Sequence, residues 1–391
     1  YVSVFRSASP FRRPLVAGCA LALGAALALT GCERGSDAIR ATAENTVAVP
    51  AECADVVANA KAAVEKASAA DQPWDGPTTG PKATTGKTIV YVAQSMQNPG
   101  VAGVAAGLTD ASAAIGWTLK VIDGQGTPSG ILSAFNQALT LKPDGIILGG
   151  FDPKTTDSQV RQANAAKIPL VGWQALATPG PSDEPKLFSN ITTKVEDVAK
   201  ISAQFVIARS NGVAGVVIFT DSSIPFAEGK SQMIQKELQT CSSVEVLKYA
   251  NIPLADVANR MPTETSALLS SLGDKWTYSV AINDVYFENA TAAFRQSGRT
   301  SATAPINVGA GDGDAAALTR IRNDDFQAAT VPSPLRSEGW QIVDELNRAF
   351  AGEKASGYVP QIHVSTKDNA SAENYWDPSG YQEAYKAIWG K

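Results

Sequence analysis

The chain has 391 residues, 44% of them hydrophobic, and a formal net charge of −5. This length exceeds what one compact core holds and predicts two lobes of ordinary size, and the apolar fraction excludes long disorder. The mildly acidic charge, with Lys and Arg scattered along the chain, excludes a patch for nucleic-acid phosphates, and the single histidine, His363, argues against His-dependent catalysis or a His-rich metal site.

The N-terminus predicts export. Arg12 and Arg13 precede an apolar run, Leu15 to Leu29, that is too short for a comfortable membrane span. The run ends in Leu29-Thr30-Gly31-Cys32, which resembles the lipobox of bacterial lipoproteins, in which the cysteine is diacylated and becomes the first mature residue. We therefore expect residues 1–31 to be a signal peptide and Cys32 to anchor the protein in the periplasm or on the outer face of the cell membrane. A short membrane anchor with an incidental cysteine is the alternative.

The remaining cysteines form a candidate disulfide. Cys19 would leave with the signal and Cys32 would carry lipid, so the mature fold keeps only Cys53 and Cys241. Two cysteines left in an oxidising compartment favour a disulfide that ties an N-terminal helix to a distant part of the body. Two free buried thiols remain the alternative, because spacing does not establish geometry.

Residues 32–86 read as an extension in front of the main body. A polar tether runs to about Pro50, residues 51–70 have apolar residues at helical spacing, and a Pro/Gly-rich linker follows from Pro73 to Gly86. From Thr88 onward the chain changes character, because short β-branched runs begin to alternate with helical stretches.

This alternation predicts two successive parallel α/β sheets. The first set of expected strands is 88–93, 118–122, 145–148, 169–171 and 187–191, separated by helices at 101–115, 131–141 and 157–166. The second set is 214–219, 244–249, 279–282, 306–308 and 327–331, separated by helices near 195–210, 226–240, 262–271, 285–296 and 313–323. The fold class is therefore α/β with two Rossmann-like lobes.

Ligands of such sheets bind outside the carboxyl ends of the strands. The segments that follow the expected strands are uncharged or acidic, with aromatic residues interleaved, which suits hydroxylated small molecules. These segments are 94–99, 149–153, 172–175, 220–226, 283–286 and 309–313.

Six short motifs occur in the order that a known family has them. They are Gln97-Asn98-Pro99, Lys142 to Ile147, Ile168 to Val171, Ile282-Asn283-Asp284, Gly311-Asp312-Gly313, and Ala328 to Val331 followed by a helix from Trp340 to Gly352. With these motifs, residues 87 to about 367 resemble the type I periplasmic binding proteins of the ribose-binding kind.

The resemblance implies two lobes joined by three crossing hinge strands and closing on a solute. The crossings would lie near 188–190, 331–334 and 359–361. The first lobe would comprise 87–189 with 333–358, and the second 190–332 with 359–391. It also implies a monomer without cofactor that delivers a sugar-like ligand to the membrane subunits of an ABC permease.

The resemblance also implies a set of ligand-binding positions. Gln94 and Asn98 match hydrogen-bonding positions of the first lobe, Asn283 and Asp312 match the Asn and Asp that hold ligand hydroxyls, and Ser333 falls near a polar hinge contact. Phe226 takes the place of a basic residue. An ionised Asp312 would make the stronger, charge-assisted hydrogen bonds.

The sequence departs from the family at two places. The Asp-Arg pair expected after the fourth strand is replaced by Trp173, Gln174 and Ala175, and the stacking aromatics after Asn-Pro are replaced by Gly100 and Val101. The rings of the site would then come from Phe151, Trp173, Phe226 and Tyr286, with Asp152 and Gln174 as further polar contacts. This pattern predicts a less charged, more aromatic site than that of a ribose-binding protein, for a monosaccharide, deoxysugar or polyol.

Structural roles compete with several of these assignments. Asp284 is expected to cap the following helix, Asp312 sits in a turn that Gly-Asp-Gly chemistry produces unaided, Asp152 before a proline suits a turn or cap, and Trp173 suits a sheet edge. Residues 309–313 lack the lysine and spacing of a phosphate loop, and no Cys or His cluster has metal-ligand spacing.

Three functions remain open from the sequence. The first is a transport receptor without chemistry of its own, and the second is a sensor subunit that presents its ligand to a chemoreceptor or kinase. The third is a secreted hydrolase with paired carboxylates such as Asp152 and Asp312, which would need turnover that Asp312→Asn abolishes.

Overall fold

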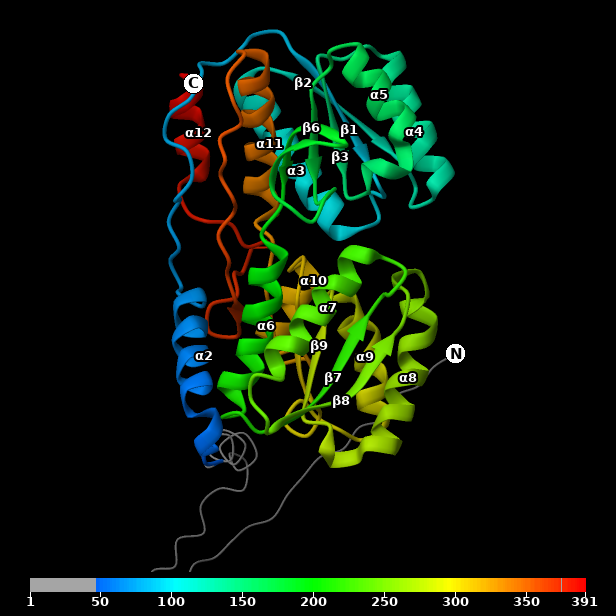
Figure 1. Cartoon of the computed structure of the whole chain (residues 1–391), viewed down its shortest axis with the longest axis vertical. Coiled ribbons are helices and arrows are strands. Elements are labelled where there is room, and N and C mark those ends of the chain that lie inside the picture. The colour runs from blue at the N-terminus through cyan, green and yellow to red at the C-terminus, as the bar shows by residue number, and fades with distance from the viewer. Residues whose placement is uncertain (1–46, 374) are drawn as a thin grey trace, which may run out of the picture.

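The computed structural model describes residues 47–373 and 375–391. The predicted signal peptide, Cys32 and nearly all of the tether lie outside the described residues. Within the two described ranges, no helix has both the length and the apolar content needed to cross a bilayer. The described chain forms two α/β lobes, one above the other in Figure 1, as the sequence predicts.

The first lobe is built on a six-stranded sheet with the order β2-β1-β3-β4-β6-β5. All neighbours are parallel except β5, which runs antiparallel to β6 at the edge. The strands are β1 (Thr88–Ala93), β2 (Thr118–Asp123), β3 (Gly145–Gly149), β4 (Leu170–Trp173), β5 (Gly180–Asp183) and β6 (Lys186–Ile191). The central strands β1, β3 and β4 are almost wholly buried, as parallel strands covered on both faces should be.

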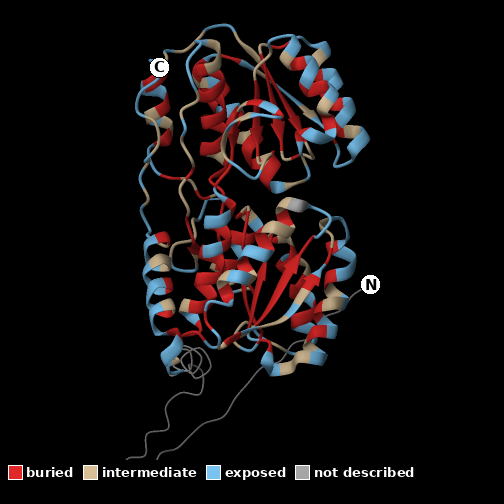
Figure 2. Cartoon of the chain, in the orientation of Figure 1, coloured by how far each residue is buried: buried red, intermediate tan, exposed pale blue. Residues whose placement is uncertain are grey.

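Five helices of the described chain belong to this lobe. They are α3 (Pro99–Ile115), α4 (Pro128–Thr140), α5 (Asp157–Ala165), α11 (Leu335–Phe350) and α12 (Tyr381–Trp389). Apolar side chains of α3, α11 and α12 share one hydrophobic cluster with the sheet, and those of α4 and α5 share a second. Buried residues accordingly concentrate in the strands and on the inner helix faces (Figure 2).

The second lobe repeats the plan with the strand order β12-β11-β10-β9-β7-β8. Its strands are β7 (Ala214–Thr220), β8 (Val244–Asn251), β9 (Tyr278–Ala281), β10 (Ile306–Gly309), β11 (Ala329–Thr330) and the antiparallel edge strand β12 (Ser365–Thr366). Its helices are α6 (Val195–Arg209), α7 (Pro225–Leu238), α8 (Val257–Leu272), α9 (Val285–Gln296) and α10 (Ala315–Arg322). Short 3₁₀ turns occur at η1 (Ala51–Cys53), η2 (Pro153–Thr156), η3 (Leu254–Asp256) and η4 (Gly273–Lys275).

The N-terminal helix α2 (Ala54–Ala67) packs on the second lobe. Its buried residues Val57 and Ala60 join the hydrophobic cluster that includes α6. Cys53, directly before the helix, forms a disulfide with Cys241, and their Cα atoms lie 5.2 Å apart. The disulfide and the apolar contacts together hold α2 against α6.

The lobes are joined at the three places that the sequence predicts, with one shift. The first crossing follows β6 at 192–194, because residues 188–190 still pair within the first sheet. The second lies at 331–334 between β11 and α11, and the third occupies the long segment 351–364 between α11 and β12.

Two further segments of the described chain also cross between the lobes. Residues 68–87 run from α2 to β1, and residues 367–380 run from β12 to α12 (Figure 1, at the side of α12 and α2). Hydrogen bonds join the crossing segments to one another. The backbone N–H of Trp74 donates to the Ser379 carbonyl at 2.8 Å, and the Tyr358 hydroxyl donates to the Asp75 carboxylate at 2.9 Å.

The last eleven residues belong with the first lobe, not with the second lobe to which the sequence assigned 359–391. Helix α12 turns its aromatic face to α11, where the Trp389 ring stacks on Trp340 with centroids 5.4 Å apart. Burial of this face decides the location of α12. The helical period of a short segment shows which face is apolar, but it does not show which lobe the face covers.

Candidate functional site

A cleft of about 480 Å³ lies between the lobes. Its walls come from the carboxyl ends of β3 and β4 in the first lobe and of β7, β9 and β10 in the second, together with the starts of α3 and α7 and the turn η3. This is the location that open parallel sheets favour for ligands. The cleft is therefore the candidate site.

Eight of the eleven residues expected in the site line the cleft. They are Asn98, Phe151, Asp152, Trp173, Gln174, Phe226, Asn283 and Asp312. These residues line one cleft from both lobes. Their contact with a ligand stays a prediction.

The other three lie behind the lining. Tyr286 was expected to supply a ring to the site, but it is part of the core of the second lobe. Its ring stacks on Phe219, and its hydroxyl donates to the Ile252 carbonyl at 2.6 Å. Gln94 lies behind Gly150, where its backbone bonds to the end of β3. Ser333 lies in the second crossing, and its hydroxyl accepts a 3.3 Å bond from the Gln174 amide.

Asn283 and Asp312 form a hydrogen-bonded pair in the second-lobe wall. The Asn283 amide donates to Asp312 Oδ2 at 2.7 Å, and Asn283 Oδ1 accepts from the backbone N–H of Val285 at 2.9 Å. Asp312 has a φ of +61°, in the left-handed region, so the flanking glycines help the turn to form. The pair thus presents one carboxylate whose direction is fixed.

The buried carboxylate of Asp284 holds this turn from beneath. It accepts bonds from the backbone N–H of Gly313 at 2.9 Å, from Thr330 at 3.1 Å and from Gln327 at 2.6 Å. Asp284 occupies the predicted N-cap position of α9, but its side chain makes no capping bond, and Asn283 accepts the bond from Val285 at that helix start instead. Burial raises the pKa of Asp284 to about 7.

Lys230 is a site residue that sequence reasoning missed. Its ammonium donates to the carbonyls of Ala310 at 2.6 Å and Ile282 at 3.2 Å, and it lies 5.4 Å from the centre of the Phe226 ring. Burial lowers the pKa of Lys230, whereas the nearby carboxylates of Asp312 and Asp284 raise it. Asp312 has the opposite balance, since burial raises its pKa and Lys230 lowers it.

Lys230 supplies a cation to the cleft wall beside Phe226. Lys230 follows Phe226 by four residues on α7, so the two side chains share one face of the helix. The spacing was readable from the sequence. The burial of the lysine was not, because a lysine in a helix is usually solvated.

Trp173 lines the cleft from the first lobe. Its ring is 2% exposed, and its Nε1 donates to Glu338 Oε2 at 2.7 Å. A Cβ at Gly100 would lie 3.3 Å from this ring and 3.2 Å from the Asp312 carboxyl carbon. Gly100 thus leaves room between Trp173 of the first lobe and Asp312 of the second.

Glu338 is buried, and its pKa is shifted in a way that affects the pH dependence of stability. Burial raises its pKa from 4.5 to about 8, and the bond from Trp173 opposes this rise. A raised folded-state pKa means that the contribution of the protonated acid to stability is fully present below pH 4.5 and is lost as the pH rises through about 8. The loss amounts to at most about 1.4 kcal/mol per pH unit.

Glu338→Gln should therefore change the pH dependence of unfolding. The amide keeps an acceptor for Trp173 but does not ionise. The melting temperature of the variant minus that of the parent should therefore increase as the pH rises from 5 to 8.5. Other buried acids that do not interact with Glu338, such as Glu345 and Asp344, contribute equally to both proteins and cancel in the difference. A difference between the two melting temperatures that stays constant with pH would contradict the raised pKa.

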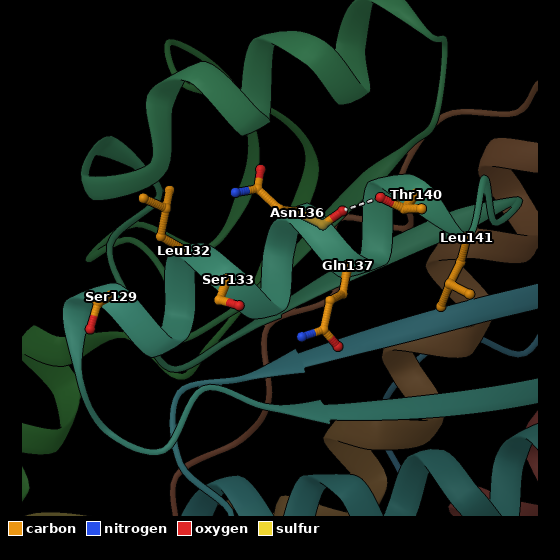
Figure 3. A pocket seen from close by; sticks show the side chains of 7 residues that line it. All are labelled: Ser129, Leu132, Ser133, Asn136, Gln137, Thr140 and Leu141. Atoms are coloured by element: carbon orange, nitrogen blue, oxygen red, sulfur yellow. Dashed lines mark hydrogen bonds between the residues drawn. The ribbon is translucent and has the colours of Figure 1, made fainter.

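A second hollow, on one face of α4, is less suited to a ligand. It measures about 560 Å³ and is lined by side chains of α4 and of Leu141, which follows it (Figure 3). The side chains of Leu132 and Asn136 point toward a neighbouring helix in Figure 3, and Asn136 Oδ1 accepts a 3.1 Å hydrogen bond from Gln159 of α5. The hollow lacks the converging walls of the cleft.

The sequence matches the family model described as periplasmic binding protein domain over residues 89–354. The chain belongs to this family. No curated protein matches the sequence of this periplasmic binding protein.

Solved structures share the two-lobed fold. An ABC sugar transporter subunit from Rhodobacter sphaeroides 2.4.1 is 17% identical, with a TM-score of 0.62 over 72% of this chain and 99% of that chain. An ABC transporter solute binding protein from Agrobacterium vitis with bound allitol is 16% identical, with a TM-score of 0.62 over 73% and 97%. A third, from Bacillus halodurans C-125 with bound myo-inositol, is 14% identical, with a TM-score of 0.60 over 74% and 97%. At these identities the likeness shows the fold alone.

Proposed function

We propose that this periplasmic binding protein captures a small, sugar-like molecule in the cleft and delivers it to an ABC permease outside the cytoplasm. The family membership and the names of the structural neighbours support this proposal, since they include an ABC sugar transporter subunit and solute binding proteins holding allitol and myo-inositol. The sugar would be a monosaccharide, a deoxysugar or a polyol.

One observation carries the proposal more than any other. The Asn283–Asp312 pair stands in the cleft close to the Trp173 ring. A carboxylate accepts hydrogen bonds from hydroxyl groups, and an aromatic ring packs on the C–H face of a sugar. The cleft therefore offers both contacts that a hydroxylated ring needs.

The amides at the cleft supply further contacts. Asn98 uses its Oδ1 to accept from the Gly100 N–H at 3.0 Å at the start of α3, which leaves its Nδ2 group for a ligand oxygen. Gln174 donates to Ser333 and keeps its oxygen as an acceptor. Asp152 caps η2 through a 2.9 Å bond from the Lys154 N–H, so its contact with the ligand would use the second carboxylate oxygen.

Capture would work by a shift between open and closed forms. The ligand stabilises the closed form because the two lobes hold different parts of it, and the crossings at 192–194 and 331–334 accommodate the rotation. The protein would act as a monomer without cofactor, lipid-anchored at Cys32, and would release its sugar unchanged. The names of the neighbours favour delivery to a permease over presentation to a sensor.

A thermal-shift screen of the purified protein against monosaccharides, deoxysugars and polyols tests this function. A ligand present at a hundred to a thousand times its dissociation constant should stabilise the fold by roughly 3–4 kcal/mol, which gives a clear rise in melting temperature. The stabilising sugar should be recovered intact after incubation. No rise across the whole panel would contradict sugar capture.

A further inference from the structure

The cleft has a polar end beside the second crossing. Ser333 of that crossing bonds to both walls, since its hydroxyl accepts from the Gln174 amide at 3.3 Å and its backbone N–H donates to the Asp312 carbonyl at 3.3 Å. The Asn283 amide completes this group through its bond to Asp312. Gln174, Ser333, Asp312 and Asn283 therefore form one hydrogen-bonded group beside the hinge.

The remaining lining of the cleft is mostly apolar. Leu176 comes from the loop after β4, and Ile224, Phe226 and Leu254 come from the second lobe. Ile224 is 37% exposed, whereas Trp173 is 2% exposed. We call the apolar side chains of Leu176, Ile224, Phe226 and Leu254, which line the cleft from both lobes, the apolar mouth.

The first-lobe part of the apolar mouth is held in place by a buried side chain. Asn190 in β6 is 1% exposed; its Oδ1 accepts from the backbone N–H of Ala175 at 3.1 Å and of Leu176 at 3.4 Å. Its amide donates to the carbonyls of Leu176 and Thr178, both at 2.9 Å. The loop that carries Leu176 is thus fixed along its backbone.

The second-lobe part has a matching anchor. Asp221, 2% exposed, accepts from the backbone N–H of Ser223 at 2.9 Å, directly before Ile224, and from the N–H of Leu254 at 2.8 Å. One carboxylate therefore sets the positions of two apolar side chains from different segments. Two separately anchored walls with apolar side chains make a built surface, not an accidental exposure of single residues.

From this division we infer that the ligand carries an apolar substituent on its sugar-like part, as an alkyl or aryl glycoside does. The inference rests on the proposed function and adds the chemical class of the substrate. The hydroxylated ring binds at the polar end, and the substituent lies in the apolar mouth.

Two observations favour this class over an unsubstituted sugar. A cavity of about 480 Å³ lies in the range that encloses drug-sized ligands, so it has room beyond one sugar ring. A sugar with hydroxyls around its whole ring would press some of them against the apolar mouth without partners. Of the charged lining residues besides Asp312, Asp152 and Lys154 are exposed, and Asp152 is already engaged in capping η2. Lys230 is buried, and its ammonium is already bonded to the Ala310 and Ile282 carbonyls.

Isothermal titration with matched probes tests the inference. D-glucose, D-galactose, D-xylose, L-arabinose and L-fucose are each compared with their methyl and phenyl glycosides, with the purified full chain. For the sugar that fits the polar end, the phenyl glycoside should bind at least tenfold more tightly than the free sugar, which burial of a few carbon groups produces.

Ile224→Ser should reduce this ratio of affinities severalfold, and Leu176→Ser provides a second variant in case the first folds poorly. Leu132→Ser is the matched control, because Leu132 lies on α4 away from the cleft and is 39% exposed, close to the 37% of Ile224. The control should keep the ratio of the parent protein.

The outcomes separate this inference from the proposed function. A free sugar that binds as tightly as its glycosides, or more tightly, overturns the inference and leaves sugar capture standing. An unchanged ratio in both Ile224→Ser and Leu176→Ser also overturns it. Silence of every free sugar and glycoside overturns both.

Discussion

Asp312→Ala is expected to weaken sugar binding by roughly 1–3 kcal/mol. The substitution removes the acceptor for ligand hydroxyls and leaves the Asn283 amide without the partner that it contacts at 2.7 Å. It also removes a nearby negative charge from the buried ammonium of Lys230. Isothermal titration with the sugar found by thermal shift measures the loss.

Two comparisons make this result specific. Asp312→Asn keeps the shape and an acceptor but not the charge, so its affinity should fall between those of the parent and of Asp312→Ala. Asp157→Ala removes an exposed acid of α5 that pairs with Arg161 outside the cleft, and it should not change the affinity. If Asp312→Ala binds the sugar with the same affinity as the parent protein, Asp312 does not contact the ligand.

Removal of the disulfide should cost about 2–5 kcal/mol of stability. The Cys53–Cys241 bond joins positions 188 residues apart and holds α2 on the second lobe. Without it, the unfolded chain gains freedom, and α2 depends only on its apolar contacts with α6. The double variant Cys53→Ala/Cys241→Ala should therefore melt at a lower temperature.

A reductant provides the control for this prediction. Dithiothreitol should lower the melting temperature of the parent toward that of the double variant and should have no effect on the variant itself. Sugar affinity should persist in the variant, since neither cysteine lines the cleft. Equal melting temperatures of the two proteins would show that the bond contributes nothing to stability.

The sequence predicted the framework of the fold because its signals are local. The central strands are short, nearly continuous apolar runs, and β1 and α9 begin and end at the predicted residues. The edge strand β5 was missed because its sequence, Gly180-Pro-Ser-Asp183, has neither apolar alternation nor β-branched residues. It forms because β6 offers it an unpaired edge.

The site was predictable only where topology alone decides it. Residues directly after strands, such as Asn283 and Asp312, line the cleft as expected, because carboxyl ends of parallel strands meet at one edge. Tyr286 lies three residues after Asn283, and its side chain packs in the core instead of lining the cleft. Lys230, Asn190 and Asp221 act through burial and long-range hydrogen bonds, which a sequence pattern does not contain.

The crystal structure of the protein soaked in its most stabilising sugar tests the central claim most directly. The account predicts density in the cleft between the lobes, with a hydroxyl group within hydrogen-bond distance of Asp312 and the ring against Trp173. Density in the hollow on α4 or elsewhere, with the cleft holding solvent alone, would contradict it.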